Sequence, residues 1–266
     1  MKGEFTFPLP ADTRKILEKD ERCENFILRF RRYLGVEKEG NTRNEKIIGD
    51  ILKKLVKEEL KDLSLPVLKR YAEAVNALKG EKVKMTLEVV EPLIVGAGSS
   101  GVLEGAELIL YPLYGFPYIP ASSLKGIMRT FCEELGDMKE EDIEEIFGGE
   151  GKRGKLVVMD GIPEDVKLGV DILTCHYSPY YTKNEPPGDW HKIMPVYFPV
   201  VSEGRFVSYL IFQEDCPLKE KLLEVAKNGM ELLGIGAKTR SGYGRMKVTY
   251  EELTKSGGTN NEEGNL

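Results

Sequence analysis

The chain has 266 residues, of which 41% are apolar and 31% are charged, enough to bury a sizeable core in one large domain. No apolar run approaches the ~18 residues of a membrane span, so we expect no membrane contact. A formal net charge of −6 excludes a uniformly basic nucleic-acid binder, so any contact with RNA or DNA must come from a local basic patch.

The four cysteines lie far apart in the sequence, without the paired spacing of a zinc site or a disulfide framework. This pattern predicts free or buried thiols in a reducing, cytoplasmic compartment. No cluster has metal-ligand spacing, and no glycine pattern runs from a strand into a helix that carries a Lys-Ser/Thr pair. We therefore expect neither a metal nor a cofactor.

Residues 1–80 are predicted to form an N-terminal helical region that packs on the core. After an irregular arm, apolar residues recur at helical spacing in three segments, from Asp12 to Gly35, from Thr42 to Leu60, and from Pro66 to Gly80. The charged residues between them are expected to form solvated faces. The pattern does not distinguish packing on this chain from packing on a neighbouring protein.

The period changes at Lys82, and the rest of the chain predicts an α/β domain of the α+β class. Strands are expected at 83–90, 155–160, 205–212 and 245–250, and helices at 122–135 and 217–233. The order βαββαβ is the ferredoxin-like plan that the RNA recognition motif shares. This domain is predicted to span 81–255, with insertions at 91–118 and 161–204, before a disordered tail at 256–266.

A glycine-rich stretch, GIGAKTRSGYGR, lies between the second helix and the last strand. It contains four glycines and three cations, with no acid among them: Gly234, Gly236, Gly242, Gly244, Lys238, Arg240 and Arg245. Free backbone amides beside Lys and Arg suit a phosphate group, so we predict contact with an RNA backbone. A structural glycine hairpin with solvated charges explains the same pattern, and the motif alone leaves both interpretations open.

A second phosphate site is predicted at the start of the helix at 122–135. Ser122 and Ser123 stand at its N-terminus, which favours an anion, and Lys125 and Arg129 lie one turn apart. The alternative is a capping serine pair with solvated cations. A third basic cluster, at 152–155, is expected to be solvated or to face a partner.

The long insertion at 161–204 contains both histidines and the only tryptophan. We predict that His176, Trp190 and His191 contact RNA or another subunit, because aromatic rings stack on bases. They equally suit the core of the insertion. Two histidines, or one with Tyr180 or Tyr181, also have the chemistry for RNA cleavage by general acid–base catalysis, although neither sits in an arrangement diagnostic of it.

Three of these motifs resemble signatures of the RAMP superfamily of CRISPR proteins. GIGAKTRSGYGR resembles its glycine-rich loop, and IFGGEGKRGKLVVMD at 146–160 resembles its phenylalanine–glycine turn into a strand. YIPASSLKGIMR at 118–129 resembles its (I)PGSSLKGxxR helix start, with Ala121 where glycine is common. Within the superfamily, LTCHYSPYY, PPGDW and PVYF at 171–201 are similar to the sixth subunit of the type III-B effector, the Cmr complex.

The resemblance implies a non-catalytic structural subunit of an antiviral ribonucleoprotein, which binds CRISPR RNA near the 3′ end of the guide. Its implied partners are CRISPR RNA, the repeated backbone subunit and the first subunit, with target RNA contacted indirectly. In that family the repeated backbone subunit cleaves target RNA. The alternative within the superfamily is a metal-independent endoribonuclease that processes CRISPR RNA.

Overall fold

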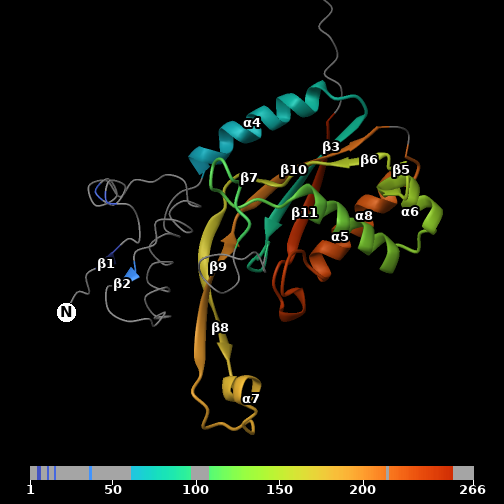
Figure 1. Ribbon diagram of the computed structural model, residues 1–266. Coiled ribbons are helices and arrows are strands. Elements are labelled where there is room, and N and C mark those ends of the chain that lie inside the picture. The colour runs from blue at the N-terminus through green and yellow to red at the C-terminus, as the bar shows by residue number, and fades with distance from the viewer. Residues whose placement is uncertain are drawn as a thin grey trace, which may run out of the picture.

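The computed structural model describes residues 61–96, 108–213 and 216–253, together with positions 5–6, 11, 15 and 36–37. Most of the predicted N-terminal helices and the whole predicted tail lie outside these residues. The described part has a mixed α/β architecture with antiparallel sheets (Figure 1). None of its helices is long and apolar enough to cross a membrane. Near the N-terminus, β1 (Phe5–Thr6) pairs with β2 (Val36–Glu37).

The central sheet has the strand order β11-β3-β10-β6, and every neighbouring pair is antiparallel. The strands are β3 (Glu81–Val89), β6 (Leu156–Val158), β10 (Arg205–Phe212) and β11 (Met246–Leu253), while β7 (Ile162–Pro163) also pairs with β10. All four predicted strands are therefore confirmed, with β6 shorter than the sequence predicts. β10 is buried on both faces, as its continuous apolar run indicates.

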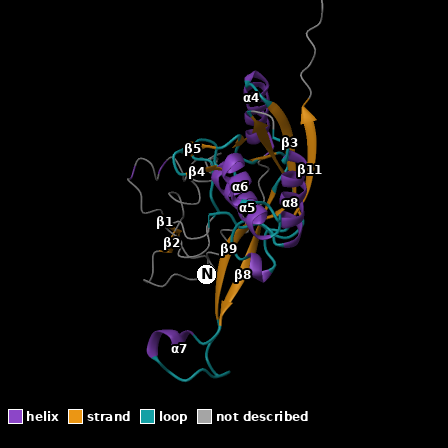
Figure 2. Cartoon of the chain, turned by 90° about the vertical axis from the view of Figure 1, so that its right-hand side faces the viewer, coloured by secondary structure: helices purple, strands orange, loops and turns teal. Residues whose placement is uncertain are grey.

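One face of this sheet is covered by α5 (Ala121–Glu134) and α8 (Lys219–Leu232), which lie side by side (Figure 2). Alternate residues of β3 point into this core and meet Leu124, Met128 and Phe131 of α5. Gly229 allows α8 to approach closely, since a Cβ there would lie 2.4 Å from the ring of Phe131. The sequence did not predict α6 (Glu140–Phe147) or the small hairpin of β4 (Gly148–Gly149) and β5 (Lys152–Arg153).

The opposite face of β10 is covered by α4 (Lys61–Ala77). Val75 is fully buried against Val207, Tyr209 and Ile211 of that strand. The predicted helix start at Pro66 is wrong, because α4 spans Lys61–Ala77 and the proline lies inside it. A proline inside a helix removes one backbone donor and crowds the carbonyl four residues earlier, and here the apolar contacts of the helix offset that cost.

A long antiparallel hairpin is formed by β8 (Lys167–Cys175) and β9 (Met194–Glu203), with α7 (Ser178–Lys183) at its tip. It projects away from the central sheet in both views (Figures 1 and 2). A bridge between Leu93 and Val201 joins its base to the segment after β3. The pattern from Met194 to Val201, with prolines at 195 and 199, predicts β9 as an edge strand, whereas the sequence does not predict β8.

Candidate nucleic-acid interface

The glycine loop, defined here as residues 234–245, is held in place by hydrogen bonds from its backbone amides, both within the loop and to the segment after β3. Ile235 N donates to Gly244 O over 2.8 Å, Ala237 N to Ile94 O over 2.8 Å, and Gly244 N to Pro92 O over 2.9 Å. A Cβ at Gly244 would lie 1.9 Å from Ile235 O, and φ there is +76°. Glycine is therefore required for close backbone approach at this position.

Six amides of this loop donate hydrogen bonds within the chain. Besides the three bonds above, those of Ser241, Gly242 and Tyr243 donate to carbonyls of the same loop. The expectation of free amides that cradle a phosphate is therefore wrong for these six residues. Gly234, Gly236, Gly242 and Gly244 all have positive φ, so their role in the loop is conformational.

The three cations of the glycine loop, in contrast to its amides, favour contact with RNA. Lys238, Arg240 and Arg245 are exposed, and none has an acidic partner within ion-pair distance among residues 61–96, 108–213 and 216–253. Lys238 itself adopts the left-handed conformation, with φ of +59°. The loop thus presents three positive charges on a backbone that is already fixed, which suits contact with phosphates.

Tyr243 connects this loop to the β8–β9 hairpin. Its hydroxyl donates to Oδ2 of Asp171 over 2.6 Å, and its ring lies 6.3 Å from that of Phe198, centroid to centroid. Burial, together with the hydrogen bond to Asp171 and its negative charge, raises the pKa of Tyr243 to about 12. Sequence reasoning missed this pair, because the two residues lie 72 positions apart.

At the start of α5, the predicted anion site already has a carboxylate from the chain itself. Ala121 N donates to Oδ1 of Asp160 over 2.7 Å, and the Tyr71 hydroxyl donates to Oδ2 over 3.3 Å. Ser122 and Ser123 are exposed, and the N-cap residue of α5 is Pro120, whose side chain makes no capping hydrogen bond. Asp160 therefore acts where a phosphate was predicted to bind.

The two cations of the same helix are also engaged within the chain. Lys125 Nζ donates to Leu156 O over 2.9 Å, and burial followed by the charges of Arg153 and Arg129 lowers the pKa of Lys125. Arg129 pairs with Glu133 over 2.7 Å and donates to Gly148 O over 3.0 Å. Phosphate binding by this helix start stays a prediction, and it would compete with these contacts.

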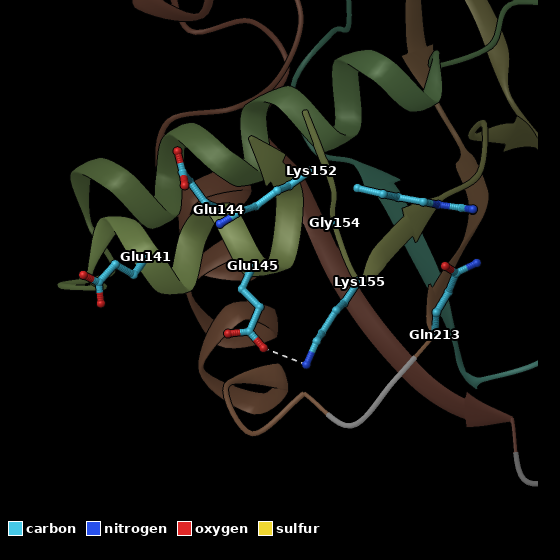
Figure 3. Close-up of a pocket in the computed structure, with 8 residues that line it drawn as sticks. Glu141, Glu144, Glu145, Lys152, Gly154, Lys155 and Gln213 are labelled. Carbon is cyan, nitrogen blue, oxygen red and sulfur yellow. Dashed lines mark ion pairs between the residues drawn. The ribbon is translucent and has the colours of Figure 1, made fainter. Parts of the chain in front are cut away.

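The third basic cluster borders a groove of about 520 Å³ (Figure 3). Lys155 of this cluster forms an ion pair with Glu145 of α6 over 2.6 Å. The lining mixes charges of both signs: Glu141, Glu144, Glu145, Lys152, Arg153, Gly154, Lys155 and Gln213. This mixture favours a protein surface or solvent over a nucleic-acid backbone.

The structure brings the predicted aromatic residues together at the tip of the hairpin. Trp190 is 80% exposed, so it does not form a core of the insertion. Its ring lies 5.8 Å from that of His191, and the ring of Tyr177 lies 6.2 Å from His176 and 6.5 Å from His191. One His191 ring nitrogen, Nε2, lies 3.0 Å from Pro186 O. In the described part of the chain, no three metal-ligating side chains form a cluster.

The comparisons with known proteins agree on one family. The model of the RAMP superfamily matches residues 86–247. The CRISPR system Cmr subunit Cmr6 of Pyrococcus furiosus is 30% identical over 58% of this chain and 64% of its own length. The CRISPR system CMR subunit Cmr6 of Saccharolobus solfataricus is 29% identical over 54% of this chain and 49% of its own length. The chain thus spans less than two thirds of both relatives.

A solved structure shows the same fold. A chain in the cryo-EM structure of the type III-B Cmr-beta bound to cognate target RNA aligns with a TM-score of 0.66. The alignment covers 79% of this chain and 72% of that chain, at 21% identity. The family match covers more than half of the chain, including the helix start at 121, the whole β8–β9 hairpin and the whole glycine loop. The chain therefore belongs to the RAMP superfamily.

Proposed function

We propose that this chain is a non-catalytic, RNA-binding structural subunit of a type III-B Cmr interference complex. Its similarity to two Cmr6 proteins supports the type of complex. The observation that carries RNA binding is the set of three exposed cations, Lys238, Arg240 and Arg245, on an otherwise fixed loop. CRISPR RNA, near the 3′ end of the guide, is the proposed ligand, with the repeated backbone subunit and the first subunit as neighbours in a cytoplasmic particle.

We further propose that the central sheet with α5 and α8 is a ferredoxin-like βαββαβ unit. The order β3-α5-β6-β10-α8-β11 along the chain and β11-β3-β10-β6 across the sheet support this arrangement. RNA recognition motifs bind RNA on the open face of such a sheet. Here α4 occupies that face over β10, and this supports an RNA path at the glycine loop instead.

The proposal assigns no catalytic role to the histidines. In the described part of the chain, no hydrogen bond joins the rings of His176 and His191, and both meet the ring of Tyr177 instead. Metal-independent cleavage of CRISPR RNA stays the rival hypothesis. If the purified chain cuts a repeat RNA once without metal, and His176→Ala or His191→Ala abolishes the cut, the rival replaces our proposal.

RNA binding is tested by Lys238→Ala combined with Arg240→Ala in the complex reconstituted with its partner subunits. The control, Lys69→Ala with Lys227→Ala, removes two exposed lysines of α4 and α8. We expect the loop variant to lose RNA affinity, and the slope of log affinity against log salt to fall by roughly 1.4, which is about 0.7 per lost phosphate contact. RNA retention equal to that of the control would refute the assignment of the loop.

A further inference from the structure

An open pocket of about 360 Å³ lies where the glycine loop meets the end of β3 and the middle of β8. Its volume is within the ~300–1,000 Å³ typical of small-ligand sites. Residues from three separate parts of the chain line it: Glu91, Pro92, Asp171, Ser241, Gly242, Tyr243 and Arg245. The family motifs include the loop but not Glu91, to which neither the sequence nor the proposed function assigns a role.

The walls of this pocket are fixed by backbone contacts. Val90 N and Glu91 N both donate to Arg245 O, over 3.0 and 3.2 Å, and Gly244 N donates to Pro92 O over 2.9 Å. The residues that follow β3 therefore lie directly against the end of the glycine loop. This holds the carboxylate of Glu91 and the guanidinium of Arg245 on adjoining segments that border one pocket.

The polar side chains that line the pocket differ in whether they already have hydrogen-bond partners within the described part of the chain. Asp171 is occupied, since Oδ2 accepts from Tyr243 and Oδ1 from Ile172 N over 2.7 Å. Glu91, Ser241 and Arg245 are exposed, and their side chains have no hydrogen-bond partner among the described residues. The pocket thus presents one anionic acceptor, one hydroxyl and one guanidinium to a ligand.

A carboxylate, a hydroxyl and a guanidinium around one pocket favour some classes of ligand over others. An isolated phosphate would meet Arg245 but also two carboxylates, which disfavour it. A divalent cation would meet Arg245, and the described residues contain no cluster of three metal-ligating side chains. A ribose with its phosphate satisfies both charges, because the phosphate accepts from the guanidinium and a sugar hydroxyl donates to the carboxylate.

We propose that Glu91 accepts a hydrogen bond from the 2′-hydroxyl of the ribose whose phosphate contacts Arg245, so that the chain distinguishes RNA from DNA at this point. The inference rests on the proposed function, because it requires a nucleic-acid backbone at the glycine loop. Glu91 then supplies the sugar selectivity that phosphate contacts lack, since phosphates are common to RNA and DNA.

The test titrates the full chain at low salt with short fluorescent oligomers of uridine, 2′-deoxyuridine and 2′-fluorouridine, which share one base. We expect uridine to bind roughly tenfold more tightly than deoxyuridine, the effect of one hydrogen bond to a charged group. The 2′-fluoro oligomer should bind as deoxyuridine does, because fluorine cannot donate. Glu91→Ala should reduce the preference to about one.

The control is Glu224→Ala, which removes an exposed acid of α8 and should raise affinity for all three oligomers equally. Equal binding of uridine and deoxyuridine by the unmodified chain, or a preference that survives Glu91→Ala, would overturn the inference alone. Tight binding of the fluoro oligomer would also overturn it, by showing that sugar shape is recognised. If no oligomer binds, or Lys238→Ala with Arg240→Ala leaves binding unchanged, the proposed function fails as well.

Discussion

The hydroxyl of Tyr243 donates a 2.6 Å hydrogen bond to Asp171, and this single bond joins the glycine loop to the middle of β8. The two residues belong to segments with different proposed partners, the loop with an RNA backbone and the hairpin with bases or a neighbouring subunit. The position of the hairpin relative to the loop therefore depends in part on this pair.

Tyr243→Phe is expected to lower the free energy of unfolding by about 1.5 kcal/mol, since it removes one hydrogen bond to a charged acceptor. Because the pKa of Tyr243 is raised in the folded state to about 12, its contribution is fully present below pH 10 and is lost as the pH rises toward 12. Chemical denaturation of both proteins between pH 8 and 12 checks this, and a stability difference that does not shrink in this window would contradict it.

Gly244→Ala is expected to destabilise the chain more than Gly242→Ala. Both glycines have positive φ, so each alanine costs about 1–2 kcal/mol in backbone strain. Only at Gly244 does the new Cβ meet the backbone, 1.9 Å from Ile235 O, whereas nothing lies within 4 Å of a Cβ at Gly242. Thermal unfolding should place the two variants about 1–3 kcal/mol apart. Equal stabilities would show that the loop can relax around the methyl group.

Lys219→Met is expected to lower the free energy of unfolding by about 1–2 kcal/mol. The side chain is only 13% exposed, and its Nζ lies 3.2 Å from Glu81 and 2.5 Å from Glu252, which ties the start of α8 to β3 and β11. The loss falls below the ~3–5 kcal/mol of a fully buried pair because both acids are exposed. Lys167→Met is the control, since its pair with Glu203 is exposed on both sides. Equal losses in urea titrations would contradict this.

Asp160→Ala is expected to destabilise the chain by about 1–3 kcal/mol, because it removes the carboxylate that caps α5 and accepts from Tyr71 of α4. Tyr71→Phe should cost less, about 0.5–1.5 kcal/mol, since only one bond is lost. A double-mutant cycle measures whether the two effects are coupled. Simple additivity would show that Asp160 does not help to fix α4 on the sheet.

The sequence predicts the central sheet and its two helices well because one face of each is buried in a single core. In β3, buried and less buried residues alternate, and in α5 the buried residues Leu124, Met128 and Phe131 recur at helical spacing. The same logic fails for β8. Its hairpin stands away from the core, so Ile172, Leu173 and Thr174 are all exposed and no alternation marks the strand.

The sequence predicts only part of the candidate site, and the reason differs from that for β8. The cations of the glycine loop could be read from the motif, because residue type and spacing are local properties. The partners of Lys125 and Arg129 could not, because the carbonyls of Leu156 and Gly148 reach them only after the chain folds back 31 and 19 residues later. Glu91 gave no signal either, since its place beside Arg245 follows from strand pairing.

The free length of the β8–β9 hairpin depends on where a contact with the rest of the chain clamps it. Nine paired residues of β8 at about 3.3 Å each give an arm of roughly 30 Å, and a 10° rotation at its base would move the tip by about 5 Å. Asp171 is the fifth residue of β8, so the bond from Tyr243 leaves only four residues of that strand, about 13 Å, beyond the clamp. The same rotation then displaces the end of the strand, where the tip segment begins, by roughly 2 Å instead.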